Sequence, residues 1–402
     1  MAERFDTLVQ GLSEEFALSI LLEKTSLVDR PSDRYFAATR LGISDTDASL
    51  NALIEATQLD TVELYDRITR RKAIEALGRR KSLKAIPALY DVLKCSDSEA
   101  VINSLYSIIR ISQKPTVDEQ QQILDVIEGE VTQTRAVIQA HTRLGINSEQ
   151  AVATIELLCD HESALVSGAA RAYLARVLGR KSLLKPLISQ LTDSVAGKRR
   201  SAVIDLGDAE SDETLDAIVC APVSMSLRAK SAFQIISSNE NHVNRKRFDP
   251  LIKKLLIDNP LGLEYRPEWQ CSQNAEQIEK NLSHRDEAKQ YGAAASLMLI
   301  EKNECLDIIS SMEERLWSDY VTHYYLTMIV GLRAFHEKSY LVRSALAETT
   351  PQYAKSRVAA AWACLSLGLN DQLEILQELS ENSQWIPLRW SCQQVIDGLA
   401  EC

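Results

Sequence analysis

The chain has 402 residues, of which 45% are hydrophobic, and it carries a formal net charge of −11. This acidic balance argues against nucleic acid or an anionic membrane surface as the main partner. No apolar run approaches the roughly 18 residues of a membrane-spanning helix, and the charged N-terminus differs from a signal peptide, so we expect a cytoplasmic protein without membrane insertion.

The eight cysteines lie far apart in the sequence and form no C-x-x-C pair. Zinc sites and redox motifs commonly use two cysteines separated by two other residues. Disulfide frameworks belong to small secreted domains. The sequence therefore predicts free thiols and no metal site.

Residues 1–33 are expected to cap the N-terminal end of a repeat array. A short apolar run precedes Ser13, which is predicted to be the N-cap of a helix that begins at Glu14. Pro31 stops this segment before the next helix. Terminal units of such arrays are atypical because they must shield the end of the core.

Residues 34–240 are predicted to be regular repeats, and the clearest unit is Arg70–Leu93. Its first half places Ala73 and Leu77 on one helical face, and Gly78 is predicted to end that helix. A second apolar face follows a basic turn, with a proline in its first turn. Two amphipathic helices joined by a short turn cannot bury both apolar faces alone, so they need neighbours of the same kind.

Copies of this small-residue helix, many ending in Leu-Gly, recur along the chain at intervals of roughly 30 to 36 residues. Strong copies lie at 34–42, 135–145, 169–179, 199–207 and 357–368, and weaker ones at 100–110, 227–236, 292–300 and 326–335. Two helices per repeat of this length are typical of HEAT or armadillo proteins. We therefore predict an all-α fold, a single curved α-solenoid over residues 1–402 with a concave groove.

An irregular insertion is predicted at 241–285, before C-terminal repeats and a cap at 286–402. It contains a basic run at 242–248 and a proline-rich stretch at 259–271 that cannot form a regular helix. Such a loop either projects from one face and carries function or is an ordinary insertion. Three tryptophans near the C-terminus are expected to pack the end of the core: Trp362, Trp385 and Trp390.

Three N-terminal stretches carry a resemblance to a known family: MAERFDTLVQGLSEE, PSDRYFAATRLG and LYDRITRRKAIEALGRRKS. They resemble the E/F clan of phycobilin lyases, HEAT-repeat cyanobacterial enzymes that attach open-chain tetrapyrroles to cysteines of phycobiliproteins. The longer single-chain members that serve phycoerythrins are the most similar. The resemblance is strong to about Gly207 and looser beyond. Two-subunit isomerising relatives carry an Asn-His-Cys motif, which this sequence lacks, so that marker does not decide between plain lyase and lyase-isomerase.

The resemblance implies a lyase that joins phycoerythrobilin through a thioether to a cysteine of a phycoerythrin subunit, the α subunit being preferred. Isomerisation of the bilin to phycourobilin stays open. No cofactor is implied, and the partners are the bilin and the acceptor protein, which supplies the nucleophile. One alternative is a non-catalytic HEAT scaffold that binds only proteins. Another is a HEAT-like DNA-repair enzyme, against which the acidic balance counts.

The densest cluster of aromatic and titratable residues in the chain begins at Trp317. At helical spacing Trp317, Tyr320 and Tyr324 share one face, while Asp319 and His323 lie on a neighbouring face. Aromatic rings can stack on a bilin, a carboxylate can accept its pyrrole N–H groups, and histidine can move protons. We therefore predict that Asp319, Tyr320, His323 and Tyr324 are catalytic. Trp317 is predicted to contact the bilin. Alternatively, the rings fill the core and Asp319 orients His323.

A second catalytic candidate is His141, which shares its predicted helix with Arg143. With Arg70, Arg71 and Arg199, Arg143 is predicted to bind the propionates of the bilin, because guanidinium groups match carboxylates with two parallel hydrogen bonds. Alternatively, His141 is simply packed or solvated. The arginines would then lie at solvated helix ends.

Overall fold

The computed structural model describes residues 9, 11–24, 27–28, 30–59, 62–238 and 246–401. Most of the short apolar run expected in the N-terminal cap, and residues 242–245 of the basic run, lie outside the described residues. Within the described ranges the chain forms helices and short turns but no β-strand. None of the described helices is long and apolar enough to cross a membrane.

The helices fall into two compact units, Met1–Leu183 and Leu184–Cys402. Unit 1 contains α2 (Glu14–Leu21), α3 (Ser32–Leu41), α4 (Asp47–Ala56), α5 (Leu64–Arg80), α6 (Ile86–Val92), α7 (Ser98–Ile111), α8 (Val117–Leu124), α9 (Val131–Leu144), α10 (Glu149–Leu157) and α11 (Ala164–Leu178). Unit 2 contains α12 (Lys185–Gln190), α13 (Ala196–Asp208), α14 (Leu215–Cys220), α15 (Met225–Ser238), α17 (Asp249–Ile257), α18 (Ala275–Leu282), α19 (Glu287–Leu299), α20 (Lys302–Leu316), α21 (Tyr320–Leu332), α22 (Ser339–Ala347), α23 (Ala354–Leu367), α24 (Leu373–Asn382) and α25 (Ile386–Glu401).

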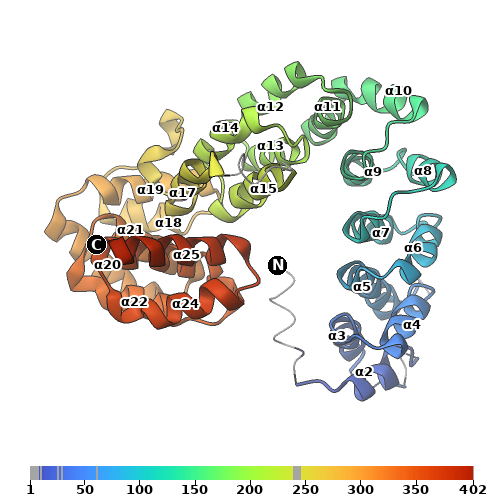
Figure 1. Ribbon diagram of the computed structural model, residues 1–402, viewed down its shortest axis with the longest axis horizontal. Coiled ribbons are helices and arrows are strands. Elements are labelled where there is room, and N and C mark those ends of the chain that lie inside the picture. The colour runs from blue at the N-terminus through green and yellow to red at the C-terminus, as the bar shows by residue number, and fades with distance from the viewer. Residues whose placement is uncertain are drawn as a thin grey trace. The chain divides into compact units, whose positions relative to one another are not determined.

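Unit 1 is a two-layer stack of helix pairs. Helices α3, α5, α7, α9 and α11 pack in sequence, each on the next, and α4, α6, α8 and α10 form a second layer against them (Figure 1). The alanine-rich helices of the sequence repeat make up the first layer. Small side chains there let neighbouring helices approach closely, while leucine and isoleucine fill the space between the layers.

Unit 2 repeats this arrangement around one irregular helix. Helices α19, α21, α23 and α25 stack in order, with α18, α20, α22 and α24 paired to them, and α13 packs on α15. Helix α17 departs from the pairing, because it contacts α14 and α15 on one side and α23 and α25 on the other. The prediction of an all-α, HEAT-like repeat fold is confirmed within each unit.

The predicted insertion is only partly irregular. It contains α17 and α18, and the proline-rich stretch between them forms two short 3₁₀ turns, Pro260–Gly262 and Pro267–Trp269, as its prolines predict. Trp269 is buried, and its carbonyl oxygen lies where a Cβ at Gly292 would be, so a side chain at Gly292 would displace the turn. Pro260 and Trp269 therefore anchor this stretch to unit 2, while most of its other residues are exposed or partly exposed.

The glycines of the Leu-Gly pairs have two different structural roles. Gly145, Gly179 and Gly368 end their helices with positive φ of 65°, 69° and 61°, as predicted. Gly78 does not end its helix, which continues to Arg80, and Gly207 also lies inside a helix. At both of these positions a Cβ would lie within 3 Å of a serine on the next stacked helix. The Leu-Gly sequence at these two positions suggests a helix C-cap. Glycine is instead required there because neighbouring helices pack closely.

We predict that Gly207→Ala destabilises the protein and that Gly197→Ala, in the same helix, does not. The new Cβ at position 207 would lie 2.7 Å from Cβ of Ser231, whereas nothing lies within 4 Å at position 197. Overpacking of this kind costs about 1–3 kcal/mol, and alanine at an open helical position contributes up to about 1 kcal/mol. Urea unfolding followed by circular dichroism measures both variants. Equal effects of the two substitutions would contradict the packing role.

Candidate active site

The predicted aromatic face does not exist as one helical surface. Helix α20 ends at Leu316, and α21 begins only at Tyr320, so Trp317 and Tyr320 belong to different elements. Asp319 is the N-cap of α21, and its carboxylate accepts a hydrogen bond from the backbone N–H of Thr322 at 2.8 Å. The spacing prediction was wrong because a capped turn interrupts the helix.

His323 lies in an enclosed aromatic stack. Its ring centroid is 3.9 Å from that of Trp317 and 4.7 Å from that of Tyr353, and only 3% of the residue is exposed. Its Nδ1 has no hydrogen-bond partner among the described residues. Burial lowers the pKa of His323 to about 4, against a smaller opposing effect of Glu348, so the imidazole is neutral at pH 7. Tyr320 is half exposed.

Tyr324 belongs to a buried polar cluster centred on the carboxylate of Asp258. The hydroxyl of Tyr324 donates to Asp258, and that of Tyr291 donates to Asp258 Oδ2 at 2.6 Å. The guanidinium of Arg228 forms a buried ion pair with the same carboxylate. We call these four residues, with Lys355, the Asp258 cluster. They come from α15, the C-cap of α17, and the N-terminal halves of α19, α21 and α23.

Arg228 has every edge of its guanidinium group engaged. Nε donates to the carbonyl of Val223 at 2.7 Å, Nη1 to that of Val219 at 2.6 Å, and Nη2 to Asp258 and to the Tyr291 hydroxyl. Burial alone would lower the pKa of Arg228, but Asp258 together with Tyr291 and Tyr324 raises it. The guanidinium group therefore keeps its charge inside the unit, with its hydrogen-bonding capacity largely satisfied.

Asp258 reaches this position through an unusual backbone conformation. It is the C-cap of α17, with φ 54° and ψ 41° in the left-handed region. Among residues with a side chain, aspartate tolerates this conformation better than most. The turn ends α17 and leaves the carboxylate within hydrogen-bonding reach of Arg228, Tyr291 and Tyr324.

Lys355 supplies a second cation next to the buried pair. Its ammonium lies 4.5 Å from the ring centroid of Tyr324, and the side chain is half-buried. Burial lowers the pKa of Lys355, partly offset by the Asp258 carboxylate. Burial also raises the pKa values of Tyr291 and Tyr324 well above 10, which makes both hydroxyls donors and not bases. Lys355 therefore lies beside Tyr324 at the edge of a cluster in which Arg228, Tyr291 and Tyr324 contact one carboxylate.

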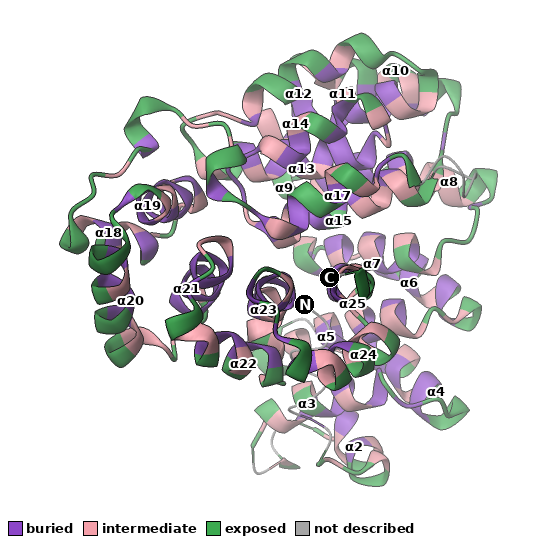
Figure 2. Cartoon of the chain, turned by 60° about the vertical axis from the view of Figure 1, so that its left-hand side comes forward, coloured by how far each residue is buried: buried purple, intermediate pink, exposed green. Residues whose placement is uncertain are grey.

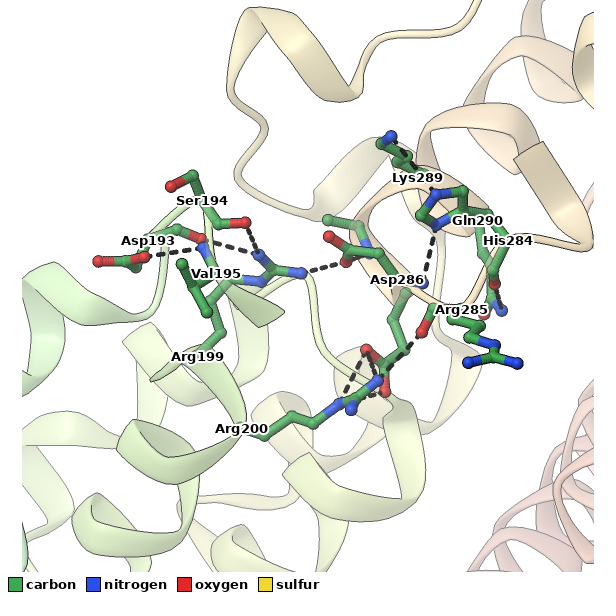
Figure 3. A network of polar contacts seen from close by, with 12 residues as sticks. Asp193, Ser194, Val195, Arg199, Arg200, His284, Arg285, Asp286, Lys289 and Gln290 are labelled. Carbon is green, nitrogen blue, oxygen red and sulfur yellow. Dashed lines mark hydrogen bonds and ion pairs between the residues drawn. The ribbon is translucent and has the colours of Figure 1, made fainter. Parts of the chain in front are cut away.

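The arginines predicted to bind propionates join helices to one another. Arg199 is fully buried, donates to the carbonyl of Asp193 at 2.7 Å and pairs with Asp286, the N-cap of α19 (Figure 3). The neighbouring Arg200 forms a two-pronged pair with Glu287. These contacts tie α13 to α19, which are far apart in sequence.

In unit 1 the predicted cations have similar roles. Arg70 is buried and donates from Nε to the carbonyl of Thr57 at 2.6 Å, and Arg71 pairs with Asp97, the N-cap of α7. Arg143 is only half-buried. Arg70 is not a solvated helix end, because its guanidinium donates to a carbonyl at the end of α4.

His141 lies in the core of unit 1. It is fully buried in α9, its Nδ1 bonds the carbonyl of Val137 at 2.9 Å, and its Nε2 has no partner among the described residues. Burial lowers the pKa of His141. His141 belongs to unit 1 and His323 to unit 2. The catalytic and binding roles predicted from the sequence stay predictions.

Sequence reasoning missed Asp258, Arg228, Tyr291 and Lys355. A usable signal was present, because an arginine stands near the start of several copies of the small-residue helix, and Arg228 occupies that position in a weak copy. Asp258 gave no such signal, since it lies where a helix meets the proline-rich stretch. Within the described ranges, no group of three or more His, Cys, Asp or Glu side chains could hold a metal ion.

Comparisons with known proteins identify several relatives. The chain is 24% identical over 388 residues to bilin biosynthesis protein CpeY of Synechococcus sp. (strain WH8020), covering 93% of this chain and 91% of that protein. It is 30% identical over 252 residues to bilin biosynthesis protein PecE of Nostoc sp. (strain PCC 7120), covering 59% of this chain and 92% of that protein. It is 26% identical over 364 residues to an uncharacterized phycocyanin operon protein Y of Pseudanabaena tenuis, covering 89% of this chain and 85% of that protein.

The fold also has a counterpart among solved structures. The CpcE–CpcF complex of phycocyanin lyase from Nostoc sp. PCC7120 matches with a TM-score of 0.52 and 24% identity, over 61% of this chain and 95% of that chain. This similarity shows a shared helical-repeat fold. No family model matches the sequence.

We predict that Arg228→Met costs about 3–5 kcal/mol of unfolding free energy, because it leaves the Asp258 charge buried without its cation. Arg343→Met is the control, since Arg343 and Asp371 form a pair at the surface and exposed pairs contribute about 0–1 kcal/mol. Adding Asp258→Leu to Arg228→Met should recover part of the loss. Chemical denaturation measures all three. A cost below 1 kcal/mol for Arg228→Met would contradict the role of the cluster.

We predict that His323 contributes to a loss of unfolding free energy in acid. Its pKa is about 4 in the folded chain and about 6.5 when unfolded, so only the unfolded chain gains a proton between these values. Stability therefore falls as pH decreases from 6.5 towards 4, by about 2–3 kcal/mol at pH 4.5. His323→Phe should remove this component, which denaturation curves at pH 7.5 and 4.5 would measure. A variant with the same pH dependence as the wild type would refute the assignment.

Proposed function

The chain belongs to the E/F-type bilin lyase family, and we propose that it attaches phycoerythrobilin through a thioether bond to a cysteine of a phycoerythrin α subunit. The observation that carries the proposal is the match to CpeY, which spans nearly the whole of both chains. The phycoerythrin acceptor follows from the resemblance of the N-terminal stretches to lyases that serve phycoerythrins. Other relatives are named for phycocyanin or phycocyanobilin, so phycocyanin is the competing acceptor.

The proposed reaction is the addition of a thiol across the ethylidene double bond of ring A. The sulfur of the acceptor cysteine bonds to the exocyclic carbon, the carbon–carbon double bond becomes single, and a proton is added at the neighbouring ring carbon. The thiol supplies both the sulfur and one proton, so no oxidant or reductant is consumed. Because the nucleophile comes from the acceptor, this chain needs no nucleophile of its own.

The proposed contribution of this chain is to hold the bilin in one conformation while the acceptor cysteine approaches. Positioning of two reactants can remove a large part of a bimolecular barrier. The Asp258 cluster supports this role, because it fixes α19 and α21 around one carboxylate and places Lys355 of α23 beside Tyr324. A bilin carries two propionates, and cations near a rigid apolar surface suit such a ligand.

The test is co-expression of a phycoerythrin α subunit with the enzymes that make phycoerythrobilin, with and without this chain. We expect the acid-denatured α subunit to keep a phycoerythrobilin absorbance only when the chain is present, because denaturation leaves only covalently attached bilin. An acceptor in which each candidate cysteine is replaced by serine is the control. A phycocyanin α subunit supplied with phycocyanobilin tests the competing acceptor.

The outcomes separate the remaining alternatives. A blue-shifted phycourobilin spectrum would identify a lyase-isomerase. Covalent colour only on phycocyanin would overturn the choice of acceptor but keep the lyase activity. An absence of covalent colour on every subunit would contradict the enzyme and leave a binding scaffold.

A further inference from the structure

Unit 2 contains an apolar pocket between α17 on one side and α21 and α23 on the other. Its volume is about 330 Å³. Met328, Ala359 and Trp362 are buried residues of its wall, while Ile257 and Lys253 of α17 line the opposite side. Figure 2 shows that α21 is buried along most of its length, so the pocket wall belongs to the packed interior of the unit.

The pocket exists because α21 and α23 pack through their smallest residues. A Cβ at Gly331 would lie 2.5 Å from Cβ of Ala363, so the two helices are in close contact there. Ala359 adds little volume to the wall beside it. Helix α17 crosses these helices without a side chain large enough to fill the resulting space. Lys253 lies at the edge, with its ammonium 5.6 Å from the ring centroid of Trp362.

The pocket continues directly from the Asp258 cluster. Ile257 precedes Asp258, Met328 lies one helical turn after Tyr324, and Ala359 lies one turn after Lys355. Residues four apart on a helix share a face. The same faces of α21 and α23 therefore carry the cluster at one level and the pocket at the next. Lys253 belongs to the lining of the mostly apolar pocket, and Lys355 lies one turn before it on α23.

We propose that this pocket binds the terminal ring D of a linear tetrapyrrole and that Lys253 pairs with one of its propionates, with Lys355 available to the other. The inference rests on the proposed function. A volume of about 330 Å³ is at the lower end for ligand pockets, which span roughly 300–1,000 Å³. It fits one end of a four-ring bilin and not the whole.

The chemistry of the transfer decides which end of the bilin enters the pocket. The acceptor cysteine must reach the ethylidene group of ring A, which an enclosed pocket lined by α17, α21 and α23 would shield. Ring D carries no reacting atom and can be buried. The propionates lie on the two middle rings, so they would lie near the pocket mouth, where Lys253 is exposed. Trp362 offers a flat face to the inserted ring.

The decisive experiment titrates phycoerythrobilin into the full chain and follows its induced circular dichroism. Ala359→Trp fills the pocket and should weaken binding at least tenfold, whereas Ala347→Trp, at an exposed position on α22, should not change it. Lys253→Met should weaken binding about three- to tenfold. Lys254→Met is its matched control, because the neighbouring lysine instead contacts Cys220 at 3.3 Å. Thermal melts establish that each variant is folded.

The dimethyl ester of phycoerythrobilin tests the ion pair without relying on the large substitution. The ester should bind the wild type more weakly than the free acid does, and Lys253→Met should distinguish acid from ester less strongly than the wild type, because only the second propionate can still pair with Lys355. If Ala359→Trp does not fold, Ala359→Leu replaces it and the ester comparison decides the case.

The results distinguish this inference from the function on which it depends. Unchanged binding and transfer by Ala359→Trp, or equal discrimination of acid and ester by Lys253→Met and wild type, would overturn the pocket assignment and leave the lyase intact. A wild-type chain that neither binds nor transfers the bilin would overturn both.

Discussion

One buried carboxylate joins the helices of unit 2. Asp258 ends α17 in a left-handed conformation and accepts hydrogen bonds from Arg228, Tyr291 and Tyr324, which come from three other helices. A charge removed from water costs several kcal/mol unless it is paired and hydrogen-bonded. If α17 moved away, Arg228 would lose its carboxylate partner while still buried, and the protein would be destabilised. The segment that interrupts the sequence repeat is therefore an integral part of the packing.

This constraint also explains why a ligand site can form in a fold made of regular helix pairs. A regular pair of HEAT-like helices fills its own interior with leucine and alanine and leaves little space for a small molecule. Helix α17 breaks that regularity where it packs on α23, and the apolar pocket beside Trp362 is lined by residues of α17, α21 and α23. A reaction whose nucleophile arrives on another protein needs such a site, which holds one end of its substrate and leaves the other accessible.

Local sequence features predicted the repeated helices well and their junctions poorly. The apolar periodicity identified the stacked helices, and the positive φ of Gly145 follows from its position after Leu144. Gly78 has the same local sequence context, but its role depends on a serine of the next helix. Asp319 is the N-cap of α21, which its spacing from His323 did not indicate, and its catalytic role stays a prediction. The Asp258 cluster depends on contacts between distant segments, which no short pattern encodes.

The most direct measurement is hydrogen–deuterium exchange of the full chain with and without phycoerythrobilin. If the bilin binds as proposed, amides of α17, α21 and α23 become more protected on binding, because a ligand in the pocket stabilises these helices against local opening. Helices of unit 1 provide the internal reference. Protection confined to unit 1, with exchange in α17, α21 and α23 unchanged, would contradict the assignment of the bilin site to unit 2.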